Sequence, residues 1–116
     1  MPWTVEFAPE FEPEFDDFAE DVQDALLAQV SLLEQFGPRL GRPRVDTLSG
    51  SDIANLKEFR FDVDGGVWRA AFAFDPTRKA IVLVAGNKAG VKQSRFYKNL
   101  IRSAEKRYAA HLERIG

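Results

Sequence analysis

Apolar residues follow two different periods in the first third of the chain. Residues 3–7 alternate between apolar and polar, which is the period of a half-buried strand, and Pro9 follows them. Over residues 13–36 the apolar positions fall on one helical face, and the dipeptide Gly37-Pro38 comes directly afterwards. The pattern therefore predicts a short strand over residues 3–7 and a single helix over residues 13–36.

The second half of the chain has the pattern of a sheet followed by a helix. Residues 57–63 and 67–74 alternate strictly around an Asp-Gly-Gly turn, which predicts a β-hairpin. Residues 80–85 form a continuous apolar run, typical of a central strand covered on both faces. Residues 94–115 return to the helical period. We expect one α+β domain over residues 1–116, in the order β-α-β-β-β-α, with an antiparallel meander packed by helices.

Residues 37–52 show neither period. They contain Pro38, Pro43 and several glycines, together with three arginines, Arg39, Arg42 and Arg44. Proline and glycine interrupt regular structure. We therefore expect an irregular connection, in which the one candidate for regular structure is a short helical turn near Asp52.

The charges are divided unequally along the chain. Residues 1–54 contain 12 Asp and Glu against 3 Lys and Arg, a net charge of −9, whereas residues 55–116 contain 6 against 13, a net charge of +7. The total of −2 and the pI of 5.4 hide this division. A split of this size favours a nucleic-acid surface or a partner-binding segment, so the question becomes what the basic part binds.

The composition excludes several kinds of chemistry. The sequence has no Cys, which excludes disulfides, thiolate metal sites and a cysteine nucleophile. The single histidine, His111, lies far along the last predicted helix, so we expect neither a histidine base nor a histidine metal site. The N-terminus has no leader-like pattern, and no apolar run approaches the length of a membrane span. We expect a soluble, cytoplasmic protein that uses no metal and no cofactor.

The strand predicted over residues 67–74 carries large residues on one face and small ones on the other. Arg69 is the exception on the small face, where a planar guanidinium on a rigid sheet can bind a phosphate through two hydrogen bonds. Arg60, on the neighbouring predicted strand, is expected nearby. The alternative is a cross-strand ion pair of Arg69 with Glu58 or Asp62, and the sequence leaves both interpretations open.

Further candidates follow the last predicted strand. Lys88 lies in a loop between two glycines, where backbone can approach a ligand closely, although as structure alone it is an ordinary solvent-exposed lysine. Tyr97 lies at the edge of the apolar face of the last helix, either as a residue at the boundary of the core or as a phenol that reaches a reacting group. The last predicted helix also carries a row of basic residues, Arg95, Lys98, Arg102 and Lys106. Like charges four residues apart favour an anionic neighbour, although a solvated face is the simpler alternative.

Several short motifs together resemble the RelE/ParE toxin superfamily, and most closely its HigB-like, phage Gp49-related branch. The resemblance covers about residues 3–112, and its motifs are weak singly but specific in their order and spacing. They are Arg42-Pro43, Asp46-Thr47-Leu48, Asn55-Leu56-Lys57-Glu58-Phe59-Arg60, Gly66-Val67-Trp68-Arg69-Ala70, Val84-Ala85-Gly86-Asn87-Lys88 and Phe96-Tyr97-Lys98-Asn99-Leu100-Ile101. The compact sheet-and-helix fold of that family agrees with the predicted order of elements.

The resemblance implies a toxin of a type II toxin-antitoxin pair. Many such toxins cut messenger RNA in the ribosomal A site without a metal, by attack of the 2′-hydroxyl on the adjacent phosphate. That reaction needs cations around the phosphate and a group that takes the hydroxyl proton. By motif, the catalytic positions correspond to Arg69, Lys88, Tyr97 and, more loosely, Lys57, and the residues expected to contact RNA are Arg60, Arg95, Lys98 and Arg102.

One departure and two alternatives accompany this resemblance. The loop position where the family has Arg is Lys88, which lacks bidentate phosphate geometry. A ParE-like member would instead poison DNA gyrase by contact, without RNA chemistry, and an inactive relative would only bind its antitoxin. In each case the expected partner is a small antitoxin, of the helix-turn-helix DNA-binding type.

Overall fold

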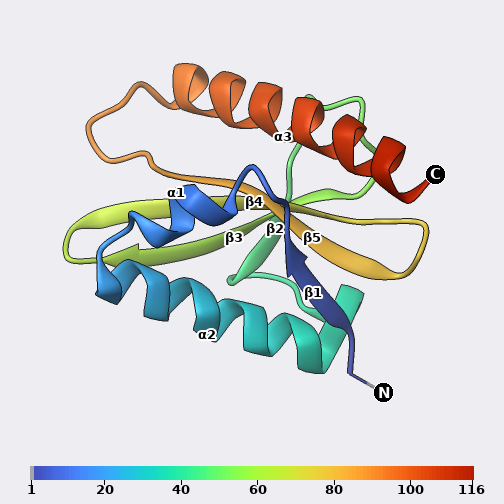
Figure 1. The fold of residues 1–116 in the computed structure, drawn as a ribbon. Helices are drawn as coiled ribbons and strands as arrows, with labels where there is room; N and C mark the ends of the chain where they lie inside the picture. The colour runs from blue at the N-terminus through green and yellow to red at the C-terminus, as the bar shows by residue number, and fades with distance from the viewer. Residues whose placement is uncertain (1) are drawn as a thin grey trace.

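The computed structural model describes residues 2–116, which form a five-stranded sheet with helices on both faces (Figure 1). In chain order the elements are β1 (Thr4–Phe7), α1 (Glu12–Asp16), α2 (Glu20–Phe36), the 3₁₀ helix η1 (Gly37–Arg39), β2 (Val45–Thr47), β3 (Leu56–Val63), β4 (Gly66–Phe74), β5 (Lys79–Asn87) and α3 (Gln93–Ile115). Within residues 2–116, no helix combines the length and the apolar character needed to cross a bilayer.

The sheet has the strand order β1-β5-β4-β3-β2, in which β1 pairs parallel with β5 and all other pairs are antiparallel. The predicted hairpin and meander are therefore confirmed. Asp64 and Gly65 form the two-residue turn between β3 and β4, with φ of 47° and 78°. A two-residue hairpin with both central φ values positive matches the right-handed twist of its strands, which explains the Asp-Gly pair at this point.

The predicted single helix over residues 13–36 is two helices. The chain leaves helical geometry after Asp16 and starts α2 at Glu20, with Ala19 extended at φ −57° and ψ 149°. Between the helices, Phe18 packs edge-to-face against Trp68 at a ring separation of 5.0 Å. No Pro or Gly marks this break in the sequence. Packing of an aromatic ring, which a local pattern does not show, explains the change of direction.

The predicted irregular connection contains an additional strand, β2, which pairs antiparallel with β3 from Val45↔Phe59 to Thr47↔Lys57. Three residues are too few to show a period, so the strand had no signal in the pattern. No helical turn is found near Asp52. Instead, the Glu105 carboxylate accepts hydrogen bonds from the Ser51 hydroxyl at 2.9 Å and from the Asp52 amide at 3.0 Å, which fixes this loop to α3.

Both faces of the sheet are covered: α2 lies on one side and α3 lies on the other (Figure 1). The small face of β4 therefore lies beneath α3. Ala71 and Ala73 are fully buried there, and Arg69 is only 6% exposed. Small residues on this face allow a helix to approach, so Arg69 is enclosed beneath α3.

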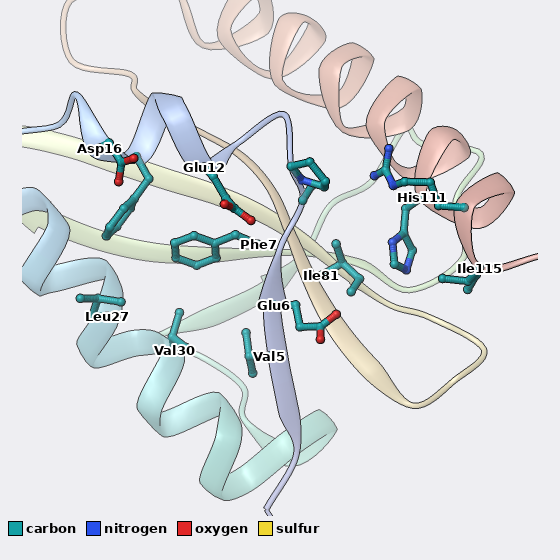
Figure 2. A pocket seen from close by; sticks show the side chains of 14 residues that line it. Val5, Glu6, Phe7, Glu12, Asp16, Leu27, Val30, Ile81, His111 and Ile115 are labelled. Atoms are coloured by element: carbon teal, nitrogen blue, oxygen red, sulfur yellow. The ribbon is translucent and has the colours of Figure 1, made fainter.

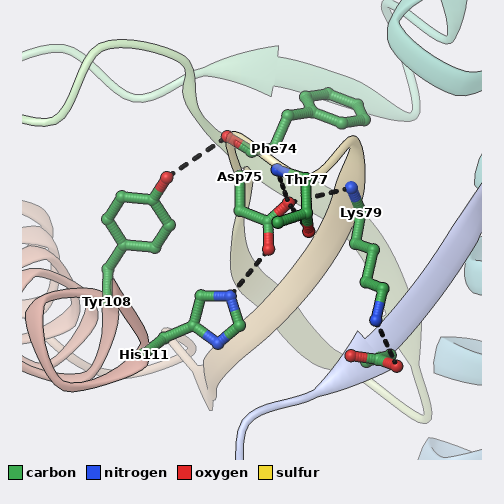
Figure 3. A network of polar contacts seen from close by, with 7 residues as sticks. Phe74, Asp75, Thr77, Lys79, Tyr108 and His111 are labelled. Carbon is green, nitrogen blue, oxygen red and sulfur yellow. Dashed lines mark hydrogen bonds and ion pairs between the residues drawn. The ribbon is translucent and has the colours of Figure 1, made fainter. Parts of the chain in front are cut away.

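Asp75, in the turn between β4 and β5, organises a buried polar network (Figure 3). One carboxylate oxygen accepts hydrogen bonds from the Thr77 amide and hydroxyl and from the Lys79 amide, while the other lies 2.8 Å from Nε2 of His111. The Tyr108 hydroxyl donates to the Phe74 carbonyl at 3.3 Å. The single histidine therefore has a structural role, because His111 attaches the end of α3 to the turn between β4 and β5.

Burial alone would raise the pKa of Asp75, but the bonds from His111, Lys79 and Thr77 outweigh it and hold the pKa below its ordinary value. A carboxyl group with a lowered folded pKa stabilises the fold above its unfolded pKa and loses that effect as pH falls through the folded value.

We predict that Asp75→Ala lowers the free energy of unfolding by about 2 to 3 kcal/mol at pH 7, because several buried donors lose their acceptor.

Urea unfolding at pH 7, 5 and 3 measures this effect, and the difference between the variant and the parent should shrink toward pH 3. Glu6→Ala is the matched control, because it removes an exposed ion pair with Lys79 at 3.4 Å. Exposed pairs contribute at most about 1 kcal/mol. A wild-type unfolding midpoint for Asp75→Ala at pH 7 would contradict the stabilising role.

Candidate functional site

A buried polar cluster lies where β3, β4 and the first turns of α3 meet. The Tyr97 hydroxyl donates a hydrogen bond of 2.9 Å to Oε1 of Glu58, and the same oxygen lies 3.8 Å from Nε of Arg69. Nη1 of Arg69 donates to the Trp68 carbonyl at 2.8 Å. Glu58 is only 5% exposed. The cluster therefore joins a tyrosine, a carboxylate and a guanidinium in surroundings with little water.

The register of the sheet explains how these groups meet. Arg60 pairs with Arg69, and Arg69 pairs with Gly86 on β5, so these positions form one row across three strands. A Cβ atom on Gly86 would lie 3.1 Å from the Phe96 ring. At this distance a side chain would crowd the Phe96 ring, so glycine favours the close approach of α3 to this row. Tyr97, the next residue of the helix, thereby reaches Glu58.

The environment changes the acidity of both partners. Burial raises the pKa of Glu58 above its ordinary value, although the hydrogen bond from Tyr97 and the charge of Arg69 partly oppose this effect. The pKa of Tyr97 is also raised, first by burial and then by its bond to Glu58. Glu58 is therefore a better proton acceptor near neutral pH than a free carboxylate, and Tyr97 remains a proton donor.

Of the two interpretations of Arg69, the ion pair with Glu58 is present. The guanidinium is mostly enclosed, and it is not displayed on an open sheet. Its Nε nevertheless has no hydrogen-bond partner. Arg69 therefore supports the Glu58 carboxylate while keeping one donor unused.

Two adjacent cavities open beside this cluster. The first, which we call the Tyr97 cavity, measures about 380 Å³ and is lined by Asp46, Thr47, Leu48, Ser49, Glu58, Arg60, Lys88, Gln93 and Tyr97. The second, the arginine cavity, measures about 740 Å³ and is lined by Gln29, Arg42, Pro43, Arg44, Arg60, Phe61, Asp62 and Arg69. Arg60 lines both, so the two cavities are neighbours at this residue.

The Tyr97 cavity brings together several of the predicted site residues. Lys88 lies with its Nζ 5.7 Å from the centre of the Tyr97 ring, and Arg60 lines the same cavity with its guanidinium 3.6 Å from Asp46. A phosphate in this cavity would therefore meet cations from two separate elements, the β5–α3 loop and β3. Tyr97 combines both of its expected characters, since it packs at the core boundary and also faces the cavity.

Other predicted residues lie elsewhere. Lys57 donates a hydrogen bond of 2.9 Å to the Thr47 hydroxyl and lines neither cavity. Residues alternate between the two faces of a strand, so Lys57 belongs to the face opposite Glu58. The predicted RNA contacts on α3 are Arg95, Lys98 and Arg102, and they line a separate cavity of about 470 Å³. Lys92, Ser94 and Asn99 complete the lining of that cavity.

Glu58 is the functional candidate that the sequence analysis missed. It was considered only as an ion-pair partner for Arg69, although it stands inside the Lys57-Glu58-Phe59-Arg60 motif. A usable signal was its place among cations: Glu58 is an acidic residue on a strand of the basic part, next to Lys57 and two positions from Arg60. Its contact with Tyr97, 39 residues away, requires the folded chain.

A larger cavity, of about 800 Å³, lies beside the edge strand β1 and contains none of the predicted site residues (Figure 2). Its walls are mainly apolar, with Val5, Phe7 and Ile81 from the strands and Leu27 and Val30 from α2. Size alone therefore does not identify the chemical site. Within residues 2–116, no group of three or more His, Asp or Glu side chains is arranged to hold a metal ion.

The match to a family model agrees with this arrangement. Residues 13–109 match the family described as Phage derived protein Gp49-like (DUF891). The chain belongs to the Gp49-like family. The match includes the Glu58 and Tyr97 cluster and both cavities, so the candidate site lies within the part of the chain that defines the family.

Two proteins of Mycobacterium tuberculosis, both named as toxins, are similar in sequence. HigB2 is 43% identical over 93 residues, which are 79% of this chain and 46% of HigB2. The match thus spans about half of that relative. HigB3 is 41% identical over 99 residues, which are 85% of this chain and 84% of HigB3. These relatives confirm the resemblance to the HigB-like branch.

A solved structure supports the fold independently. A double mutant of the Escherichia coli toxin RelE in the free state superposes with a TM-score of 0.62, covering 92% of this chain and 98% of RelE. The sequences are only 14% identical. The RelE-like α+β fold expected of a Gp49-like chain is therefore confirmed.

We predict that Tyr97→Phe raises the pKa of Glu58 further, because the variant loses the hydrogen bond that favours the charged carboxylate. NMR titration of the Glu side-chain carboxyl carbons measures this change directly. Tyr108→Phe is the matched control, because Tyr108 lies on the same helix and its hydroxyl bonds to the Phe74 carbonyl instead. Identical Glu58 titrations in the two variants would show that the Tyr97 bond has no electrostatic role.

Proposed function

We propose that this protein is the toxin of a type II toxin-antitoxin system and that it cleaves messenger RNA in the ribosomal A site without a metal. The observation that carries the proposal is the Tyr97 cavity, where a carboxylate with a raised pKa, a protonated phenol and two cations share one space. Membership of the Gp49-like family and the similarity to proteins named as toxins support the cellular role.

In the proposed reaction, Glu58 takes the proton of the 2′-hydroxyl as the oxygen attacks the adjacent phosphate. Tyr97 gives its proton to the 5′-oxygen as the bond between that oxygen and phosphorus breaks, which leaves a 2′,3′-cyclic phosphate. The proton on Glu58 then returns to Tyr97 through their 2.9 Å hydrogen bond. Both groups end in their starting states, so no metal or other co-reactant is needed.

The negative charge that develops on the phosphate is stabilised by Lys88 and Arg60. Fixed cations in a partly enclosed site stabilise such charge more strongly than solvent does. Arg69 holds the Glu58 carboxylate in position and limits the rise of its pKa. Lys57 remains a prediction as a catalytic residue, and three cations on α3 remain predictions as RNA contacts, namely Arg95, Lys98 and Arg102.

The proposed partners are messenger RNA on the ribosome and a cognate antitoxin of the helix-turn-helix type. Co-expression tests the second directly: growth should stop when this protein is expressed alone and resume when the product of the neighbouring gene is present. Growth that continues without that product would contradict the toxin role.

We predict that Glu58→Gln and Tyr97→Phe each lower the cleavage rate by about 10² to 10⁴, the usual contribution of a general acid or base. New mRNA 5′ ends produced with translating ribosomes, mapped by primer extension, give the rate. Tyr108→Phe is again the control and should cleave at the parental rate.

The same assay has a predicted pH dependence. The rate should rise with pH as Glu58 loses its proton, at a pH above the ordinary carboxyl range, and fall at high pH as Tyr97 ionises. Absence of new 5′ ends would contradict the nuclease proposal. Inhibition of gyrase supercoiling in that case would indicate the ParE-like alternative.

A further inference from the structure

Two residues that line the arginine cavity each have a buried side-chain atom that lacks a hydrogen-bond partner. Within residues 2–116 these are Oε1 of Gln29, on α2, and Nε of Arg69, on β4, and both residues line this one cavity. Gln29 is 92% buried, since only 8% of its surface is exposed. A buried polar atom without a partner costs about 1 to 3 kcal/mol, and native structures rarely retain one without a reason.

The cavity is also strongly cationic. Four arginines line it with a single carboxylate, that of Asp62. Arg42 and Arg60 share Asp46, at 3.0 and 3.6 Å, so one acidic group serves two guanidiniums. Arg44 makes no ion pair with any residue in the range 2–116. A ligand that enters therefore meets an excess of positive charge and at least one uncommitted guanidinium.

The shortness of β2 creates this cavity. The β2–β3 ladder ends at the Val45↔Phe59 pair, and the last link beyond it is the bond from the Arg60 amide to the Arg44 carbonyl at 2.8 Å. The rest of β3, through Asp62, therefore has no strand beside it on this edge. The chain carrying Arg42 and Arg44 turns away there and forms the outer wall of the cavity.

We propose that the arginine cavity is a nucleotide subsite for the RNA strand that continues from the Tyr97 cavity past Arg60. The phosphate of this nucleotide lies against Arg44 and Arg60, and an exocyclic amino group of its base donates a hydrogen bond to Oε1 of Gln29. Adenine, cytosine and guanine carry such a group, whereas uracil does not. This subsite rests on the proposed RNA function and gives it a preference for particular bases at one position.

The dimensions and chemistry of the cavity fit this ligand. About 740 Å³ lies within the range of about 300 to 1,000 Å³ typical of small-molecule sites. Arginine commonly binds phosphate groups, because the N–H donors of its planar guanidinium match the spacing of two phosphate oxygens. A buried amide that accepts from a base edge reads the base, whereas the phosphate contacts only position the strand.

The test uses fluorescence anisotropy with cleavage-resistant, 2′-O-methylated oligomers of cytidine and of uridine. Wild-type protein should bind the cytidine oligomer about tenfold more tightly, the value of one buried hydrogen bond of about 1.4 kcal/mol. In Gln29→Leu the two affinities should become equal. Gln35→Leu, an exposed position on the same helix, is the matched control and should keep the tenfold preference.

The phosphate contact has its own test. Arg44→Ala should weaken both oligomers alike and reduce the slope of log K against log salt by about 0.7, because one phosphate contact to a single strand is lost. Arg39→Ala, which removes an exposed arginine outside both cavities, should leave the slope unchanged. An unchanged slope in Arg44→Ala would contradict the phosphate contact.

The proposal is overturned if wild-type protein binds both oligomers equally, prefers uridine, or keeps its preference in Gln29→Leu. Cytidine monophosphate that binds as tightly as the oligomer would exclude a strand through both cavities. Thermal unfolding shows that Gln29→Leu is folded, and its midpoint should not fall, since the orphaned acceptor is gone. Base preference without ribosomal cleavage would contradict the proposed function alone, whereas cleavage without base preference would contradict the subsite alone.

Discussion

The close contact between α3 and the sheet brings together Tyr97, Glu58 and Lys88, three of the groups proposed to act in the reaction. Gly86 lies against Phe96, where a side chain would crowd the ring, and this lets the first turns of the helix approach β4 and β5. Tyr97 then reaches Glu58, and Lys88, in the loop that leads to the helix, is held beside the Tyr97 ring. At its other end the helix is attached by His111 to Asp75.

Burial of Glu58 links the stability of the fold to its chemistry. Removing a carboxylate and a guanidinium from water is costly, and a buried ion pair need not stabilise a protein. Here the same desolvation raises the pKa of Glu58 and makes it a useful proton acceptor. Arg69 and Tyr97 hold that carboxylate in place while leaving it only partly satisfied. A more stable, apolar version of this cluster would lose the reactive group.

The charge division along the chain is rearranged in space. Glu14, from the acidic part, binds Arg107 of α3 through two bonds of 2.8 and 2.6 Å, and Glu10 pairs with Arg114 at 3.3 Å. Much of the charge at the end of α3 is therefore neutralised internally. The cations left to line the two cavities come from both parts of the chain, and the acidic part supplies Arg42 and Arg44.

The sequence by itself determined the hairpin, the meander and the two long helices, because alternation, helical periodicity and Asp-Gly turns are local properties. It also identified Arg60, Lys88 and Tyr97, which the structure brings into one cavity. Only the tertiary structure decided the break at Phe18, the strand β2, the burial of Arg69 and the partnership of Glu58 with Tyr97. The same holds for Gln29, whose unsatisfied oxygen has no signature in the sequence. Each of these depends on contacts between residues far apart in the chain, and no local pattern records which distant atoms become neighbours.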